Sequence, residues 1–167
     1  YKNKIQGGSI RVLCKKDFKN KVYRVANIFL ENEKKTIIND KNYIKNWSNK
    51  IYENMYQLEK FIKKEVSKNK LVYGYGAPTK ATLLIKLGNL SKMIPYIIED
   101  NDLKINKYIP NTRIKIVSDK ILKDNPPDLV IVFAWNFVFD IMNKLKKKKF
   151  KKLDIIVPLP NLKIYKI

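Results

Sequence analysis

Residues 72–80 (VYGYGAPTK) bring together residue types that could hold a phosphate group. Two of the five glycines of the chain lie here, and glycine lets the backbone turn sharply and lets a ligand approach closely. The proline that follows favours the first turn of a helix, whose free N–H groups attract anions. We therefore expect this turn to bind the phosphate end of a nucleotide through the following residues: Gly74, Tyr75, Gly76, Ala77, Thr79 and Lys80.

The turn matches a dinucleotide-binding fingerprint only in part. The spacing Gly74-x-Gly76 agrees with its first two glycines, but Thr79 stands where the third glycine belongs. Glu99 or Asp100 ends the next predicted strand, where such sites place a carboxylate that binds ribose. The pattern leaves open an NAD site, another nucleotide site, or a glycine turn that serves packing alone.

Two further polar segments follow predicted strands: residues 100–113 follow the second strand, and residues 135–136 follow the strand LVIVF. Because the carboxyl ends of parallel strands meet at one edge of a sheet, we expect both segments to face the glycine turn. Trp135 could stack on a base and Arg113 could pair with phosphate, although the first could equally be a core residue and the second an exposed loop charge. The rim of the predicted pocket then consists of Asp100, Asn101, Arg113, Trp135 and Asn136.

Strand and helix patterns alternate along the second half of the chain. Short apolar runs predict strands at 71–73, 93–98, 114–117, 129–133 and 153–157, and helical spacing predicts helices at 78–88, 118–122 and 136–146. The first half predicts a strand at 8–14, a helix at 21–34 and a long helix from Asp40 with an apolar packing stripe. The expected fold is α/β: a Rossmann-like open, mainly parallel sheet with helices on both faces, preceded by an N-terminal strand and a long helix.

The composition excludes several classes of site. The chain has no histidine and a single cysteine, Cys14, which rules out a Ser-His-Asp triad, a Cys-His pair, a histidine-bound zinc and an internal disulfide. One cysteine fits a reducing compartment. No apolar run is long enough to span a membrane, and the first residues lack the apolar core of a signal peptide. We therefore expect a cytoplasmic protein.

The net charge of +21 has two explanations: a partner that is nucleic acid or an anionic membrane, or the drift of a chain saturated with Lys, Asn and Ile. All but three of the 36 basic residues are lysines, whereas nucleic-acid readers tend to enrich arginine. The lysines are also scattered, apart from those at 146–149 and 151–152. Drift is the preferred explanation, and the charge still favours an anionic small molecule.

Three separated segments resemble the C-terminal domain of the SAM-dependent sugar C-methyltransferases: GYGAPTKATLL (74–84), IEDNDLKINKYIPNTRIKI (98–116) and PPDLVIVFAWNF (126–137). A fourth, GGSIR (7–11), is similar to the Gly-Gly-Ser-hydrophobic-Arg strand that precedes this domain in the family. The order and spacing of the segments agree, and the resemblance covers most of the chain.

The resemblance implies one part of a larger enzyme. Members of this family use SAM to methylate carbon on nucleotide-diphosphate-linked deoxy-keto-sugars. The resemblance implies an enzyme of three parts: a cysteine-rich zinc module, a central SAM-binding domain and this Rossmann-like domain, which helps bind the nucleotide-sugar. The catalytic base of the family is a histidine of the central domain, so no catalytic residue is carried over to this chain. Gln6 stands where the family has a histidine before Gly-Gly-Ser.

We therefore expect a single Rossmann-like domain over 1–167, in which 1–39 joins the SAM domain, 40–68 is the long helix and 69–167 is the α/β core. It would bind the nucleotide-sugar and be inactive alone. SAM and zinc would be bound by other parts of the same polypeptide, and those parts would be the partner of this domain. Two alternatives stay open: an NAD-binding Rossmann domain, and a basic nucleic-acid-binding module.

Overall fold

The structure is a computed structural model that describes residues 2–3, 9–14, 16, 23–35, 40–148, 150 and 152–167. The chain divides into two compact units, Tyr1–Lys50 and Ile51–Ile167. Whether the chain forms the single domain expected from the sequence stays a prediction. Within the described residues, no helix combines the length and the apolar composition that crossing a bilayer requires.

The described residues of the first unit form two short strands and helix. Strands β1 (Lys2–Asn3) and β2 (Ser9–Ile10) pair antiparallel, and helix α1 spans Arg24–Lys34. The strand predicted over 8–14 is therefore confined to two residues among those that the structure describes. Helix α2 (Lys41–Val66) begins in this unit and continues into the second, where its apolar stripe is buried.

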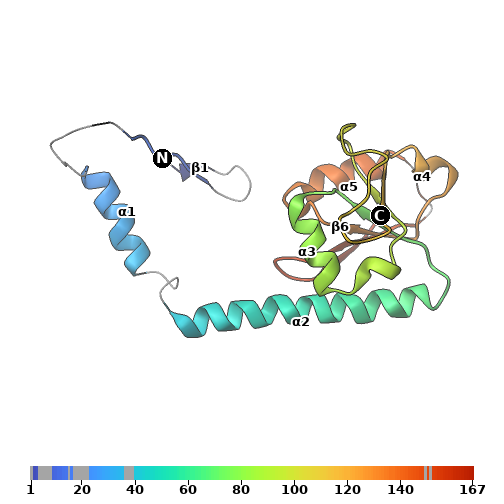
Figure 1. Ribbon diagram of the computed structural model, residues 1–167, viewed down its shortest axis with the longest axis horizontal. Coiled ribbons are helices and arrows are strands. Elements are labelled where there is room, and N and C mark those ends of the chain that lie inside the picture. Colours follow the sequence, from blue (N-terminus) through green and yellow to red (C-terminus); the bar gives the residue numbers. More distant parts are fainter. Residues whose placement is uncertain are drawn as a thin grey trace. The chain divides into compact units, whose positions relative to one another are not determined.

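The second unit is built on a six-stranded sheet with the strand order β5-β4-β3-β6-β7-β8. Counted along the sheet's own chain order, this is 3-2-1-4-5-6, the order of the Rossmann fold. Helices lie around its strand β6 (Figure 1). The strands are β3 (Val72–Tyr75), β4 (Tyr96–Ile98), β5 (Lys115–Val117), β6 (Leu129–Val132), β7 (Asp154–Val157) and β8 (Lys163–Lys166). All neighbours pair parallel except β7 and β8, which pair antiparallel. The predicted fold class is confirmed.

Helices cover both faces of the sheet because alternate strand residues point to opposite sides. Beneath one face, Val72 and Ile131 pack with apolar residues of α2 and α3 (Thr79–Leu87). On the other face, Tyr73 and Val130 pack with α4 (Ile121–Asp124) and α5 (Val138–Lys146). The central strands β3 and β6 are buried along their whole length, which explains why LVIVF reads as an unbroken apolar run.

One strand of the sheet escapes sequence prediction. Strand β8 carries the residues KIYK, of which only Tyr165 is half-buried, and it lies at the edge of the sheet. Its short, exposed and charged sequence is typical of an edge strand that gains its stability from pairing with a neighbour. Pairing of this kind leaves no apolar pattern for sequence reasoning to detect.

The connections of the sheet turn in opposite directions at β3 and β6. From β3 the chain proceeds through α3 to β4 on one side, and from β6 it proceeds through η4 (Trp135–Phe137) and α5 to β7 on the other. Such a reversal leaves a crevice at the carboxyl ends of the two adjacent strands, where α/β proteins bind ligands. The fold therefore directs attention to the segments after Tyr75 and after Val132.

The two glycines of the β3 turn make room for the protein's own atoms. A Cβ at Gly74 would lie 2.6 Å from Cγ1 of Ile97 and 2.9 Å from the ring of Phe133. A Cβ at Gly76 would lie 2.6 Å from Cβ of Ala134, and Gly76 has a φ of +81°. The close approach that the sequence suggested for a ligand is thus used by Ile97 of β4 and by Phe133 and Ala134, which directly follow β6.

We expect Gly74→Ala to lower the free energy of unfolding by about 1 to 3 kcal/mol, because the added methyl group overpacks the space between β4 and β6. Urea denaturation followed by circular dichroism measures the effect. Lys86→Ala, on the exposed side of α3, is the control and should change stability by no more than about 0.5 kcal/mol. Equal denaturation midpoints for Gly74→Ala and the unmodified chain would contradict this account of the packing.

Candidate functional site

Two short segments touch at the carboxyl ends of β3 and β6, where the strand order predicts a ligand crevice. Gly76 lies against Ala134, which directly precedes η4, so the first turn of α3 and the start of η4 are held side by side. Glycine is needed at position 76 because the backbone there is left-handed and closely approached. The strand-end segments that sequence analysis paired are thus neighbours in space.

Lys80 is the cation of this crevice. Its Nζ lies 3.5 Å from the centroid of the Trp135 ring, a cation–π contact that fixes the ammonium group over the indole. No carboxylate pairs with Lys80 among the residues that the structure describes. Partial burial lowers the pKa of Lys80 below its usual value. A half-buried ammonium without a counter-ion attracts an anionic ligand.

The first turn of α3 adds hydrogen-bond donors beside Lys80. Pro78 is the N-cap and offers no side-chain cap, and the Ala81 N–H bonds back to the Pro78 carbonyl. The N–H groups of Thr79 and Lys80 have no acceptor in the part of the chain that the structure describes. The side chain of Thr79 is exposed. Together with the ammonium, these groups could receive a phosphate from solvent.

The β4 side of the same turn is closed by Glu99. Its Oε2 accepts the Ala77 N–H at 2.8 Å, and its Oε1 accepts the N–H groups of Asp100 at 3.0 Å and Asn101 at 3.2 Å. Lys104 completes the arrangement, because its Nζ lies 3.0 Å from the Ala77 carbonyl oxygen and 3.5 Å from Oε2 of Glu99. Burial would raise the pKa of Glu99, but these N–H groups and the nearby Lys104 lower it on balance. The carboxylate is therefore ionised and fully occupied.

Asp100 and Asn101 are also engaged by the protein itself. Asn101 accepts the Leu103 N–H through its side-chain oxygen. Asp100 accepts a hydrogen bond from the hydroxyl of Tyr75 at 3.2 Å and forms an ion pair with Lys144 of α5. Asp100 and Asn101, both predicted rim residues, thus stabilise the loop after β4. The side-chain oxygens of both residues already accept hydrogen bonds from the protein.

The cluster of Tyr75, Asp100 and Lys144 joins β3, the β4 loop and α5 at the carboxyl edge. Lys144 also lies 3.6 Å from Asp119, which pairs with Lys148 at 3.0 Å. Burial opposes the charged form of Lys144, but hydrogen bonds to Asp100 and Tyr75 raise its pKa on balance. Burial, together with the charge of Asp100, raises the pKa of Tyr75 to about 12.

The structure does not bring Arg113 to this edge. Strand β5 begins at Lys115 beside Tyr96, the first residue of the parallel strand β4, so Arg113 lies at the amino-terminal edge of the sheet. The chain must return there before a parallel strand can begin, and residues 106–109 run back along β5 to do so. Arg113 lines an open hollow at that end with Lys92. The expectation that it faces the glycine turn is corrected.

Trp135 and Asn136 lie beside the turn, as predicted, but with different environments. Trp135 packs against the hydrophobic clusters of both sheet faces while Lys80 covers its ring. The indole is therefore a support for Lys80 more than a free surface for a stacked base. Asn136 is exposed and could contact a ligand.

Sequence reasoning named Glu99 as one of two candidate carboxylates but missed Lys104 and Lys144. A lysine five residues after the acid is a weak signal in a chain that has lysines throughout. Lys144 comes from the helix predicted at 136–146, for which no site residue beyond Asn136 was named, and its pairing with Asp100 depends on how α5 lies on the sheet.

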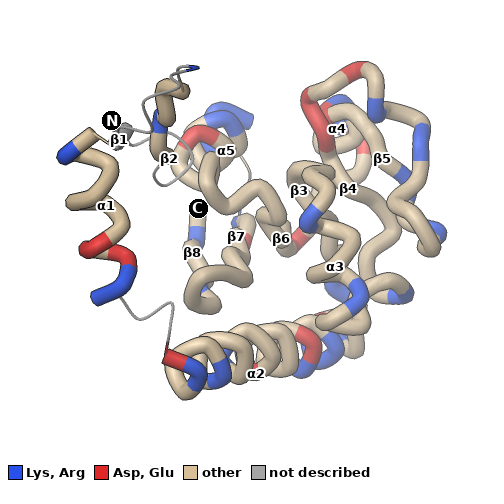
Figure 2. The backbone as a smooth tube through the Cα atoms, turned by 60° about the vertical axis from the view of Figure 1, so that its left-hand side comes forward, with Lys and Arg blue, Asp and Glu red and all other residues tan. Residues whose placement is uncertain are grey.

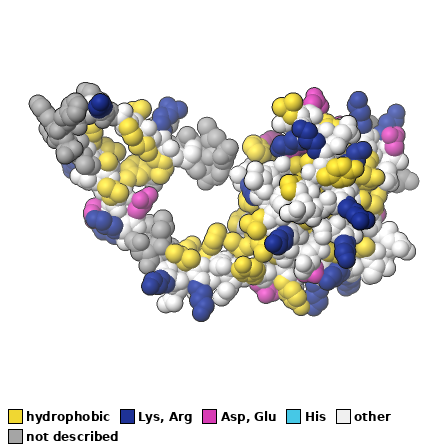
Figure 3. All heavy atoms as spheres, in the orientation of Figure 1, with side chains coloured by type: hydrophobic (Ala, Val, Ile, Leu, Met, Phe, Trp, Pro, Cys, Tyr) yellow, Lys and Arg dark blue, Asp and Glu magenta, His cyan; other side chains and the backbone are white. Residues whose placement is uncertain are grey.

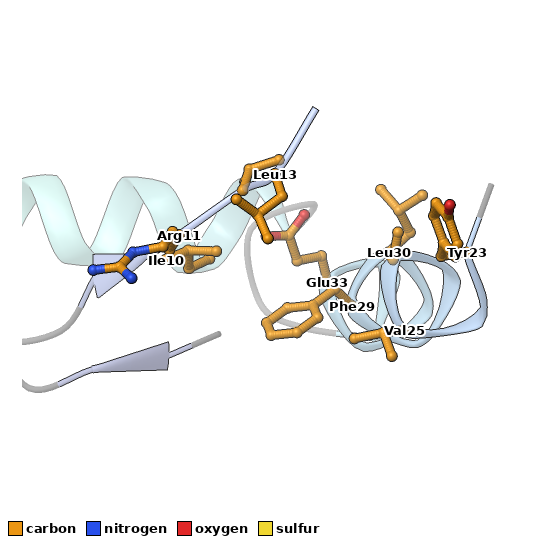
Figure 4. Close-up of a pocket in the computed structure, with 10 residues that line it drawn as sticks. Ile10, Arg11, Leu13, Tyr23, Val25, Phe29, Leu30 and Glu33 are labelled. Atoms are coloured by element: carbon orange, nitrogen blue, oxygen red, sulfur yellow. The ribbon is translucent and has the colours of Figure 1, made fainter. Parts of the chain in front are cut away.

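A second hollow, of about 530 Å³, lies within the first unit (Figure 4). Apolar side chains of α1 line it, with Leu13 and neighbouring residues of the segment after β2. It contains none of the residues predicted to bind phosphate. Among the described residues there is also no group of three or more acidic, histidine or cysteine side chains that could hold a metal ion.

Comparisons with known proteins agree with the resemblance seen in the sequence. A family model described as "C-methyltransferase C-terminal domain" matches residues 4–160. The C-methyltransferase NovU of Streptomyces niveus is 30% identical over 109 residues, which are 65% of this chain and 26% of NovU. The chain thus spans about a quarter of the length of this relative. The crystal structure of UDP-D-quinovosamine 4-dehydrogenase from Vibrio fischeri matches 59% of this chain and 93% of its own, at 16% identity and a TM-score of 0.38.

We expect the unfolding free energy to fall above pH 10 in a way that Tyr75→Phe removes. The buried phenol, with a pKa of about 12, keeps its proton after the unfolded chain has lost it, so its contribution is complete below pH 10 and is lost as the pH rises. Between pH 8 and pH 11 the free energy of unfolding should fall by about 1 kcal/mol more for the unmodified chain than for Tyr75→Phe.

Urea denaturation at the two pH values measures this difference. Tyr52→Phe, at an exposed tyrosine of α2, is the matched control. Parallel stability curves for Tyr75→Phe and the unmodified chain would show that the phenol is not held in its neutral form.

Proposed function

This chain belongs to the family of C-methyltransferase C-terminal domains, and we propose that it is the substrate-binding part of a SAM-dependent C-methyltransferase acting on nucleotide-diphosphate-linked deoxy-keto-sugars. The family membership is supported by the match over residues 4–160 and by the relative NovU, whose name gives the same reaction class. The nature of the substrate rests on the sequence resemblance and on the chemistry of the crevice. The single cysteine fits a cytoplasmic enzyme.

The observation that carries the proposal is the ammonium of Lys80 at the start of α3, which pairs with no carboxylate in the part of the chain that the structure describes. Trp135 holds it in place, and the N–H groups of Thr79 and Lys80 lie in the same turn. A diphosphate offers several oxygens to these donors, and charge-assisted hydrogen bonds of this kind are stronger than neutral ones. Anchoring the diphosphate here would leave the nucleoside and the sugar to reach outward, with exposed Asn136 beside them.

The β4 side of this turn does not fit the adenosine of SAM. In Rossmann nucleotide sites the carboxylate after the second strand binds the ribose hydroxyls. Here Glu99 and the Ala77 N–H satisfy each other. SAM, which supplies an electrophilic methyl group when bound, is therefore assigned to the rest of the enzyme. So is the general base that removes the proton beside the keto group, because this chain has no histidine and no evident candidate.

A nucleic-acid partner finds no support in the distribution of charge. Figure 2 shows lysines and arginines spread over helices, strands and loops, with acidic residues among them on α1, α2 and α4. On the face seen in Figure 3 the cationic side chains of the second unit are likewise separated by polar and apolar ones. A continuous cationic stripe, which tracks a phosphate backbone, is not seen on that face.

We expect Lys80→Ala to weaken the binding of a nucleoside diphosphate sugar at least tenfold, because one charge-assisted contact to the diphosphate is lost. Isothermal titration calorimetry with UDP-glucose and dTDP-glucose measures this. The melting temperature should stay nearly unchanged, since Lys80 is half-buried and pairs with no carboxylate among the described residues. Lys86→Ala, later on the same helix, controls for the loss of one positive charge.

Equal affinity of Lys80→Ala and the unmodified chain would remove the phosphate role from Lys80. A collapse of the melting temperature would instead show that Lys80 is structural. A DNA oligonucleotide titrated at two salt concentrations tests the alternative, because non-specific attraction to lysines disappears with modest salt. DNA binding that persists and exceeds the affinity for both sugar nucleotides would overturn the proposed function.

A further inference from the structure

From the arrangement around Ala77 we infer that Glu99 determines the nucleotide specificity of this crevice: it blocks the side next to β4, where a dinucleotide site binds the ribose of one of its two nucleotides. The inference deepens the proposed function by stating which nucleotides the site rejects, and it rests on that function for the use of the other side. Glu99 touches no ligand in this role; it acts by occupying donors that a ligand would need.

The two groups that Glu99 joins are those that a dinucleotide site uses. In such sites the carboxylate at the end of the second strand binds ribose hydroxyls, and backbone N–H groups after the glycines bind the pyrophosphate. Here the carboxylate follows β4 and its Oε2 lies 2.8 Å from the nitrogen of Ala77, the residue after the second glycine. One bond therefore satisfies the ribose acceptor and a phosphate donor at once.

The carboxylate is held firmly in that position. It accepts three backbone N–H groups and lies beside the ammonium of Lys104, which also bonds to the Ala77 carbonyl oxygen at 3.0 Å. The N–H and the carbonyl oxygen of Ala77 are thus both bound by side chains of one loop. A carboxylate with this many donors has no lone pair left to offer a ribose.

Charge adds to this loss of free hydrogen-bonding groups. A phosphate that approached the Ala77 N–H would meet an ionised carboxylate at hydrogen-bond distance, and like charges so close repel strongly. On the other side of the turn, Lys80 has no carboxylate partner among the described residues and the Thr79 N–H has no acceptor there. The crevice therefore accepts one nucleotide diphosphate at α3 and excludes a ligand that extends toward β4.

The test compares NAD⁺ and UDP-glucose on the same variants by calorimetry. The unmodified chain should bind NAD⁺ at least tenfold more weakly than UDP-glucose. Glu99→Ala should gain at least fivefold in NAD⁺ affinity, and Glu99→Gln, which keeps the size and loses the charge, should gain by a smaller factor. UDP-glucose affinity should change by less than about twofold in both variants, since its diphosphate lies on the Lys80 side.

Asp102→Asn is the matched control, because Asp102 is an exposed acid in the same loop and a change there removes one charge without freeing Ala77. If Glu99→Ala fails to fold, as judged by its melting curve, Glu99→Gln decides the result. The inference is overturned if NAD⁺ binds the unmodified chain as well as UDP-glucose does, if the folded Glu99 variants gain nothing, or if Asp102→Asn gains equally. If UDP-glucose binds no variant while Glu99→Ala gains NAD⁺ affinity, the proposed function fails and the role of Glu99 stands.

Discussion

The contact between Gly76 and Ala134 is the constraint on which the crevice depends. It holds the carboxyl ends of β3 and β6 together at the point where the connections of the sheet turn apart. A side chain at position 76 would separate these two segments, since its Cβ would lie 2.6 Å from that of Ala134. The position of Lys80 over Trp135 follows from this contact, because one residue comes from each side of it.

The two sides of the turn have opposite electrostatic character. On the β6 side, an ammonium and backbone donors lack acceptors within the described residues, so that side favours an anion. On the β4 side, Glu99 already provides the anion and Lys104 balances it. A site organised this way selects by charge as well as by shape, because a ligand gains energy on one side and is repelled on the other. This asymmetry distinguishes the crevice from a dinucleotide site built on the same strand order.

The proposed function divides the work of catalysis between this chain and the rest of the enzyme. The chain spans about a quarter of NovU, and its composition offers no histidine for proton transfer. What its own residues provide is a rigid turn with a fixed cation, and such preorganised groups bind a charged substrate without losing much side-chain freedom. The chemistry that the family name implies would then depend on groups supplied from outside this chain.

The sequence by itself determined the α/β class, the parallel strands and the glycine turn that leads into the helix at residues 79–87, because burial on both faces and glycine in a turn leave strong local patterns. Only the tertiary structure decided which side chains meet there. It placed Arg113 at the opposite edge, showed that the glycines admit Phe133 and Ala134, and turned Glu99 onto Ala77. The physical reason is that strand ends are fixed by local pattern, whereas the partner of a polar side chain depends on how distant segments are packed together.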